Sequence, residues 1–127
     1  MMRFDKKNED KLKEILYTSC VHDAKFKNVE YSPKKDCIKI ELINEFFEVE
    51  IKLIFENVRF SLAIKSEECL NFGTIISLTV EEGFSYLQNY CPRVSEFVKD
   101  SVYMLFQTFS GGELHIVSDN ITVEIIK

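Results

Sequence analysis

Residues 49–64 carry the pattern that most restricts what this chain can fold into, because apolar and polar side chains alternate along most of their length. A period of two places successive side chains on opposite faces of a β-strand, so that one face can be buried and the other left in water. The apolar set changes from odd to even positions after Glu56-Asn57. The apolar residues before the change are Val49, Ile51, Leu53 and Phe55, and those after it are Val58, Phe60, Leu62 and Ile64.

A two-residue hairpin turn at Glu56-Asn57 accounts for this change of phase, because folding the chain there sets apolar side chains opposite apolar side chains. Asn57 favours the positive φ of a type I′ turn, whereas Glu56 does not, so a longer loop is the alternative. The alternation continues backward through residues 36–43 and 24–31, which a turn containing Pro33 separates. We therefore predict a four-stranded antiparallel meander over about residues 24–65.

The C-terminal quarter of the chain shows similar turn signals. Asp119-Asn120 suits a type I′ turn, and Ser110–Gly112 suits a three-residue loop with a glycine in the bulge position. These turns predict a second meander over about residues 101–126. In that meander His115 lies opposite Glu124 on the exposed face, where such a cross-strand pair makes a modest surface contact.

The rest of the chain supplies one helix and one further strand. Residues 6–18 have apolar side chains on one face and Asp5 as a suitable N-cap, which predicts a helix. Residues 73–81 predict a strand, and residues 83–100 are open between helix and loop. The fold class is then α+β and mostly antiparallel β, with about eight strands in two meanders. We expect these to form a sandwich or a strongly curved sheet beside the helix.

Length and charge set limits on function. The chain has 127 residues, which suits a single domain spanning 1–127, and its formal net charge is −5. Residues 1–40 carry 10 basic and 7 acidic side chains, whereas residues 41–127 carry 6 basic and 14 acidic, which gives net charges of +3 and −8. An acidic body argues against nucleic-acid binding, which needs clustered Lys and Arg. It suits a basic protein partner, or simply keeps the protein in solution.

The four cysteines and the N-terminus indicate the compartment. No C-x-x-C pair or zinc-ribbon spacing occurs among the cysteines. The N-terminus lacks the apolar segment of a secretory signal, and no apolar stretch approaches the ~18 residues that a membrane span needs. We expect a cytoplasmic protein with reduced thiols, no membrane contact, no metal and no cofactor.

Cys20, His22 and Asp23 form the first group of candidate functional residues, at the junction between the helix and the first strand. A thiol two residues from an imidazole can act as a nucleophile with its base, although such pairs are usually assembled by the fold and not by local sequence. The structural alternative is a polar junction in which His22 and Asp23 hydrogen-bond the backbone and Cys20 packs. No nucleotide-binding glycine motif is present, and we predict no catalytic residue.

Glu41, Glu48 and Glu50 form the second group of candidates. If they share one face of the sheet, their mutual repulsion would be relieved by a basic protein partner, and we take them as candidate partner-binding residues. The alternative is an ordinary solvated face of the sheet. Paired carboxylates of the glycoside-hydrolase kind would need a cleft with aromatic platforms, and this chain has no Trp.

Half of the chain resembles a family of small bacterial proteins, some of which are classed as immunity proteins of polymorphic-toxin systems. The resemblance covers about residues 20–80 and lies in His22-Asp23-Ala24, Ile38–Leu42 and Ile51–Val58. In that pattern a His-Asp dipeptide precedes a strand meander, and a Phe-acidic-small-Val turn closes a hairpin. The turn usually carries Gly where this chain has Asn57. The resemblance implies a small cytoplasmic β-rich protein that blocks a protein toxin without catalysis, and it supplies no site residues.

The sequence therefore favours a non-enzymatic protein-binding module, similar to immunity proteins, that occludes a basic protein partner. Two alternatives stay open at this point. One is a homo-oligomeric structural subunit that associates through a sheet edge, and the other is a small-ligand binder with no recognised motif.

Overall fold

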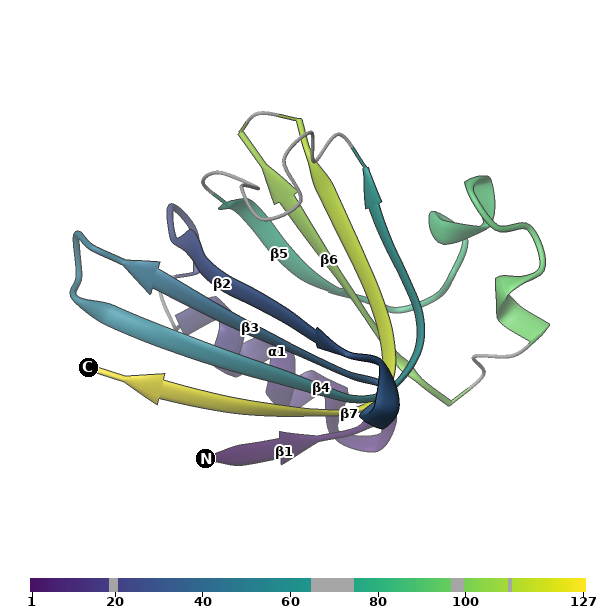
Figure 1. The fold of residues 1–127 in the computed structure, drawn as a ribbon, viewed down its shortest axis with the longest axis horizontal. Coiled ribbons are helices and arrows are strands. Elements are labelled where there is room, and N and C mark those ends of the chain that lie inside the picture. Colours follow the sequence, from purple (N-terminus) through teal and green to yellow (C-terminus); the bar gives the residue numbers. More distant parts are fainter. Residues whose placement is uncertain (19–20, 65–74, 97–99, 110) are drawn as a thin grey trace.

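The computed structural model describes residues 1–18, 21–64, 75–96, 100–109 and 111–127, and Figure 1 shows its arrangement. The helix is α1 (Glu9–Thr18), and 3-10 turns cover Lys6–Asn8, Pro33–Lys35, Leu87–Asn89 and Val94–Glu96. The strands are β1 (Met2–Phe4), β2 (Lys25–Ser32), β3 (Cys37–Asn44), β4 (Val49–Ile64), β5 (Ile75–Glu81), β6 (Val102–Thr108) and β7 (Glu113–Ile126).

The described strands form one antiparallel sheet of seven strands, in the order β2-β3-β4-β7-β6-β5, with β1 paired to β7. The prediction of a mostly antiparallel β protein with one N-terminal helix is thus confirmed. The strand predicted at 73–81 is confirmed over its described residues as β5, and the open segment 83–100 contains two short 3-10 turns among its described residues. The described residues form seven strands where about eight were predicted, because two predicted hairpins are continuous strands and β1 was not predicted.

The first missing hairpin is the one predicted at Glu56-Asn57. β4 runs unbroken through these residues and pairs with β7 on both sides of them. Asn57 has a φ of 52°, and the pairing slips by one residue between Val58 and Phe60. A β-bulge inserts an extra residue and bends the strand, so it disturbs the alternation of side chains much as a tight turn would.

The second missing hairpin is the one predicted at Asp119-Asn120, where β7 also runs on without a break. Figure 1 shows β4 and β7 bending together, which carries β5 and β6 away from the plane of β2 and β3. Of the loop predicted at Ser110–Gly112, Ser110 lies outside the described residues, and Gly112 pairs across the loop because the backbone N–H of Thr108 donates to its carbonyl at 3.0 Å. Gly111 has a φ of 88°, as a glycine bulge requires.

An ion pair spans the bend. Arg59 donates from Nε and Nη2 to the two carboxylate oxygens of Asp119, at 3.1 and 2.7 Å. Ser101 donates to the same carboxylate at 3.0 Å. The hydrogen bond from Arg59 holds the pKa of Asp119 below its ordinary value. One two-pronged contact therefore joins the bulged residue of β4 to β7, at the point where both strands change direction.

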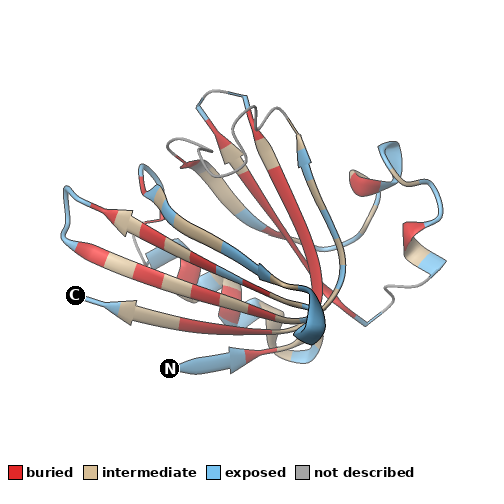
Figure 2. Cartoon of the chain, viewed as in Figure 1, coloured by how far each residue is buried: buried red, intermediate tan, exposed pale blue. Residues whose placement is uncertain are grey.

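Two groups of buried side chains lie on opposite faces of the sheet, because alternate residues of β6 belong to different groups. Met104 and Phe106 join the larger group, which also includes Leu12 and Leu16 of α1. Tyr103 joins the smaller group, which segment 84–94 covers. Figure 2 shows β6 buried along almost all of its length, as expected of a strand with both faces covered.

The predicted helix at 6–18 is confirmed, as a 3-10 turn that continues into α1. Asp5 caps its start as expected, because its carboxylate accepts from the backbone N–H of Lys7 at 2.9 Å. Asn8 accepts in return from the backbone N–H of Asp5 at 2.7 Å, which completes a reciprocal cap. The two buried leucines of α1 lie four residues apart, so one face of the helix rests on the sheet.

The two outer ends of the sheet approach each other at one point. The backbone N–H of Asp23 donates to the carbonyl of Ile75 at 2.9 Å, and the N–H of Ile75 donates to the carbonyl of Ala24 at 2.8 Å. These bonds tie the chain just before β2 to the first residue of β5. They place the junction between α1 and β2 beside the loop that joins β6 to β7.

Replacing Asp119 with Asn should lower the free energy of unfolding at neutral pH, because it removes the ion pair across the bend. Since the folded state lowers the pKa of Asp119 from 3.8, the carboxylate stabilises the fold above about pH 4 and loses this effect as the pH falls through the lowered pKa. Urea unfolding of both proteins should show a gap in the free energy of unfolding that closes as the pH is lowered below about 4. The exposed control Glu30→Gln should show no such closure, and a gap for Asp119→Asn that persists in acid would contradict the role of the pair.

Candidate functional site

His115 is fully buried, on the face of the sheet that segment 84–94 covers. The prediction that it faces solvent opposite Glu124 is wrong, because β7 does not fold back on itself. Its neighbours across the sheet are instead Leu62 of β4 and Leu105 of β6. The rings of Tyr86, Tyr90 and Tyr103 surround the imidazole, with centroids at 5.6, 5.6 and 5.8 Å.

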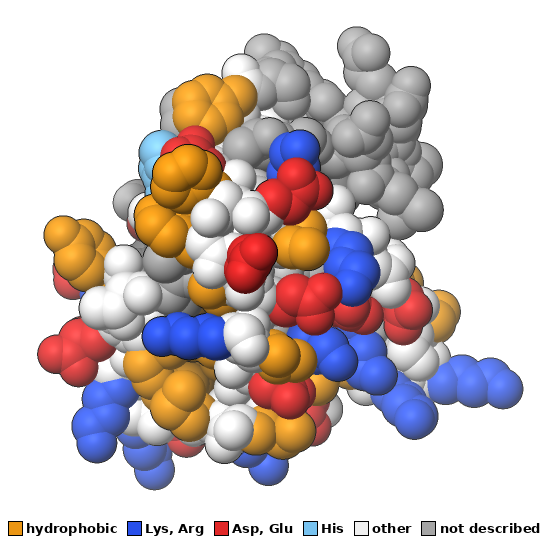
Figure 3. Space-filling model, turned by 90° about the vertical axis from the view of Figure 1, so that its left-hand side faces the viewer, with side chains coloured by type: hydrophobic (Ala, Val, Ile, Leu, Met, Phe, Trp, Pro, Cys, Tyr) orange, Lys and Arg blue, Asp and Glu red, His pale blue; other side chains and the backbone are white. Residues whose placement is uncertain are grey.

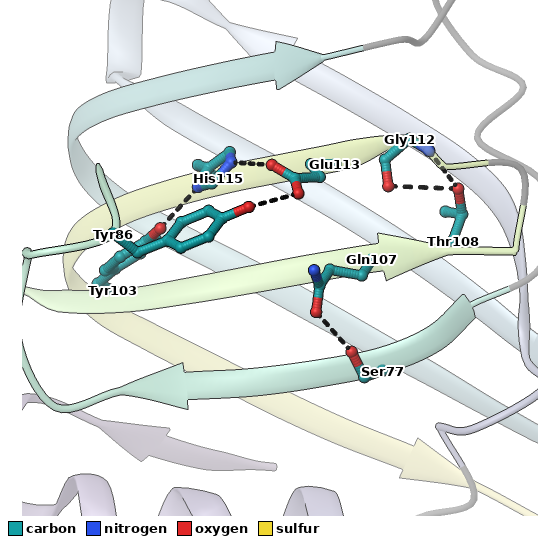
Figure 4. Close-up of polar contacts among 8 residues, drawn as sticks. All are labelled: Ser77, Tyr86, Tyr103, Gln107, Thr108, Gly112, Glu113 and His115. Carbon is teal, nitrogen blue, oxygen red and sulfur yellow. Dashed lines mark hydrogen bonds and ion pairs between the residues drawn. The ribbon is translucent and has the colours of Figure 1, made fainter. Parts of the chain in front are cut away.

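Four side chains form a continuous hydrogen-bonded chain, which we call the histidine network: Tyr103, His115, Glu113 and Tyr86 (Figure 4). The Tyr103 hydroxyl lies 2.6 Å from Nδ1 of His115, and Nε2 of His115 lies 3.0 Å from Oε1 of Glu113. The Tyr86 hydroxyl donates to the other oxygen of Glu113 at 2.6 Å. His115 and Tyr103 are buried and Glu113 and Tyr86 partly buried, and each of their polar atoms has a partner, as buried polar groups require.

The protonation of the network follows from these contacts. Burial acts to raise the pKa of Glu113, but hydrogen bonds from Tyr86 and His115 outweigh it and hold the pKa below its ordinary value. The hydrogen bond to Glu113 raises the pKa of Tyr86, and burial raises the pKa of Tyr103. Glu113 is thus a charged acceptor, and both tyrosines keep their protons. A neutral imidazole with its proton on Nε2 satisfies every contact.

A hollow of about 470 Å³ opens beside Glu113, at the ends of β5, β6 and β7, and we call it the polar hollow because each described side chain that lines it carries a polar group on an otherwise largely hydrocarbon surface. Ser77 donates to Oε1 of Gln107 at 3.0 Å, and Gln107 also hydrogen-bonds Glu113. Thr108 and Gly112 bond each other through Oγ1 of Thr108 and the backbone of Gly112, as Figure 4 shows. The described lining of this polar hollow consists of Ser77, Gln107, Thr108, Gly111, Gly112 and Glu113.

His22 and Asp23, the predicted polar junction, lie at the surface between α1 and β2. Nδ1 of His22 is 3.1 Å from Oδ2 of Asp23, and both side chains are exposed. The hydrogen bonds that fix this junction come from its backbone: Asn44 donates to the carbonyl of His22 at 3.3 Å, and Asp23 bonds Ile75 as described above. Cys20, the predicted partner of His22, lies outside the described residues.

Glu41, Glu48 and Glu50 differ in their surroundings. Glu50 accepts from Lys27 at 2.8 Å, and this hydrogen bond lowers the pKa of Glu50. Glu41 lies opposite Lys52 of β4 in the sheet. Glu48 is exposed in the turn between β3 and β4, with a φ of 55°. Each of the two glutamates within strands thus has a lysine beside or opposite it, and Glu48 is the most open of the three.

The turn that holds Glu48 also exposes two phenylalanines. Phe46 and Phe47 are 86% and 59% exposed, and their rings meet edge to face with centroids at 4.9 Å. The backbone N–H groups of both donate to Oδ1 of the buried Asn44 at 3.1 Å. Because Asn44 also bonds the carbonyl of His22, one side chain fixes the turn and the α1–β2 junction together.

A third exposed phenylalanine, Phe109, belongs to the same part of the surface. Its ring lies 6.1 Å from that of His22, edge to face. We call this surface the loop end: the β3–β4 turn (44–49), the α1–β2 junction (21–24) and Phe109. Figure 3 views the molecule from the side of this turn and shows hydrophobic side chains among acidic and basic ones. A group of exposed aromatic side chains is typical of an interaction site.

Comparisons with known proteins identify no relative: no protein-family model, no curated protein and no solved structure matches the chain. The resemblance to immunity proteins therefore stays a prediction. Within the described ranges, no helix is both long and apolar enough to cross a bilayer. In the same part of the chain, His, Cys, Asp and Glu side chains form no group that could hold a metal ion.

Sequence reasoning missed the histidine network because it took β7 for an exposed hairpin. One signal could have located it. Residues 102–106 form an unbroken apolar run, which is typical of a strand buried on both faces. His115 itself stands between Leu114 and Ile116-Val117, which extends the same apolar signal to the segment that contains it. The aromatic loop end could have been noticed from the adjacent Phe46 and Phe47, which stand between residues 36–43 and 49–64.

Replacing Tyr103 with Phe keeps the ring but removes the donor to Nδ1 of His115. A buried polar atom left without its partner costs about 1–3 kcal/mol, so the free energy of unfolding measured in urea should fall by that amount. The matched control is Tyr31→Phe. Tyr31 is 60% exposed, so the loss of its hydroxyl should lower the free energy of unfolding by about 0.5 kcal/mol or less. Equal values for the two variants would show that His115 does not depend on this hydroxyl.

Glu48 should be replaceable with a gain in stability, because its left-handed backbone disfavours a side chain of this kind. Asn tolerates that conformation better, so Glu48→Asn should raise the free energy of unfolding by about 0.5–1 kcal/mol. Glu45→Asn, in the same turn but without a positive φ, serves as the control and should give no gain. A loss of stability in Glu48→Asn would mean that the carboxylate itself supports the turn.

Proposed function

We propose that this protein is a non-enzymatic protein-binding module that occludes a basic protein partner, in the manner of immunity proteins. The observation that carries the proposal is the pair of exposed phenylalanines in the β3–β4 turn, held in place by a buried asparagine. The loop end is then the contact surface. The protein acts by covering the partner and not by chemistry.

The two phenylalanines of the β3–β4 turn are held rigidly, which favours the free energy of binding. Aromatic side chains at the centre of an interface supply much of the binding energy, but ordering them on binding costs entropy. At the loop end much of that cost is met on folding, because Asn44 fixes the backbone of Phe46 and Phe47 and the two rings pack against each other. The partner meets a formed apolar surface.

Charge argues for a basic partner. The loop end carries three carboxylates, on Asp23, Glu45 and Glu48. Lys25 neutralises part of this charge, at 3.7 Å from Glu45. Carboxylates around an aromatic centre attract a positively charged surface and disfavour acidic ones, which speeds encounter and improves selectivity. The net charge of −8 over residues 41–127 acts in the same direction.

The non-enzymatic part of the proposal draws on the surroundings of the two histidines. His22 contacts Asp23 and Phe109, and His115 contacts tyrosines and Glu113. Among the described residues neither imidazole hydrogen-bonds a serine, threonine or cysteine that it could activate. The histidine network is better suited to hold Glu113 in one position than to transfer a proton to a substrate.

The test is capture of the partner from native lysate with tagged wild-type protein and matched variants. Wild type should capture a basic protein in stoichiometric amount, and the double variant Phe46→Ser with Phe47→Ser should not capture it. Glu48→Lys should weaken its capture at least about tenfold. Charge reversal of Glu41 or Glu50 should act less, because each already has a lysine beside or opposite it. Tyr31→Ser and Glu30→Lys, exposed on β2, are the controls and should capture the partner like wild type.

Two results would overturn the proposal. One is a captured protein whose binding does not respond to the phenylalanine variants or to Glu48→Lys. The other is self-association of the purified protein, detected by light scattering at micromolar concentration and abolished by the same variants, which would assign the loop end to a homo-oligomer.

A further inference from the structure

We propose that the polar hollow is a receptor site for a side-chain cation, the ammonium of a lysine or the guanidinium of an arginine, with Glu113 as its counter-ion. The chemistry of the site is argued from the hollow alone. The assignment of the cation to a basic protein partner rests on the proposed function. This makes the hollow a second contact point beside the loop end.

Glu113 carries a charge that no lysine or arginine of the described residues neutralises. Glu113 is an ionised carboxylate with a side chain only 15% exposed. Its partners are the Tyr86 hydroxyl, the Gln107 amide and the His115 ring, and no Lys or Arg of the described residues forms an ion pair with it. These hydrogen bonds stabilise the carboxylate, but none of the three donors is a lysine or arginine that would balance its full charge. A cation that enters the hollow meets that charge in a partly desolvated place, where attraction is stronger than in water.

The composition of the lining supports the same assignment. Every described side chain that lines the hollow carries an oxygen: Ser77, Gln107, Thr108 and Glu113. The rest of the described lining is Gly111 and Gly112, and no described Lys or Arg belongs to it. A carboxylate accepts up to about four hydrogen bonds, and three are supplied by the protein. One acceptor position of Glu113 is thus left for a ligand that donates N–H groups.

The Glu113 carboxylate is held in one position by its hydrogen bonds before any ligand binds. Figure 4 shows Glu113 held from one side by His115 and Tyr86, while Gln107 and Ser77 lie on the neighbouring strands. A fixed carboxylate loses little freedom when a ligand binds, which favours affinity. In this proposal the histidine network keeps the Glu113 carboxylate charged and fixed in position beside the hollow.

The hollow lies next to the loop end. Phe109 of the loop end directly follows Thr108 of the hollow in sequence, and Gly111 and Gly112 complete the same loop. A protein that rests on Phe109 can therefore extend a long basic side chain into the hollow. A flexible lysine or arginine has the reach and the N–H donors for this contact.

The experiment titrates the ¹⁵N-labelled full chain with methylguanidinium, n-butylammonium and tetramethylammonium chlorides at constant ionic strength. The first two donate N–H groups, whereas tetramethylammonium has the same charge and no donor. The expected result is saturable shifts of the Gly111, Gly112 and Glu113 amides with the first two only. Glu113→Gln should weaken this binding at least about tenfold, the effect of losing a charge-assisted hydrogen bond. Glu124→Gln, on the same strand outside the hollow, should bind like wild type.

A second variant keeps the inference testable if Glu113→Gln disturbs the fold. Ser77→Leu leaves the histidine network intact and fills the hollow from the edge strand, so it should abolish the saturable shifts. Equal, non-saturating shifts with all three cations would overturn the site, as would unchanged binding in both variants. Cation binding without any partner loss in the phenylalanine variants would reject the proposed function and keep the site. Loss of the partner in the phenylalanine variants, with no cation binding to the hollow, would keep the proposed function and reject the cation site.

Discussion

The pairing of β4 with β7 along their whole length is the constraint on which the rest of the structure depends. Both strands bend at the same place, where β4 carries a bulge and Arg59 reaches across to Asp119. Because both strands bend there together, they stay paired on either side of the bulge while the sheet changes direction. The half of the sheet beyond the bend can then be covered on both faces, by the main core on one side and by segment 84–94 on the other.

Double coverage explains why a polar network survives inside a small protein. A buried histidine and carboxylate are costly unless every polar atom is satisfied. Here two tyrosines, one from β6 and one from the covering segment, supply the missing partners. The network ends at Glu113, where the strands run out and the polar hollow begins. Glu113 is thus held by the core on one side and open on the other to the hollow in which we propose that a cation binds.

The loop end follows from the same geometry. The bend brings β5 to the start of β2, and the bonds between Ile75 and residues 23–24 place the α1–β2 junction beside the β6–β7 loop. Asn44 then connects that junction to the β3–β4 turn. Three loops that are distant in the sequence come together with their aromatic side chains exposed, which makes one surface out of single exposed residues.

The sequence by itself determined the local structure: the helix with its Asp5 cap, the strands at 25–32, 37–44 and 75–81, and the glycine loop after β6. These depend on side-chain period and on local turn chemistry, which neighbouring residues carry. Only the tertiary structure decided whether Asn57 and Asn120 end a strand or lie within one, because a turn and a bulge disturb the alternation in the same way. The choice depends on the pairing of β4 with β7, a contact between residues some 60 positions apart. Burial of His115 and exposure of Phe46 follow from that choice, since the face on which a side chain lies has no meaning until the sheet is assembled.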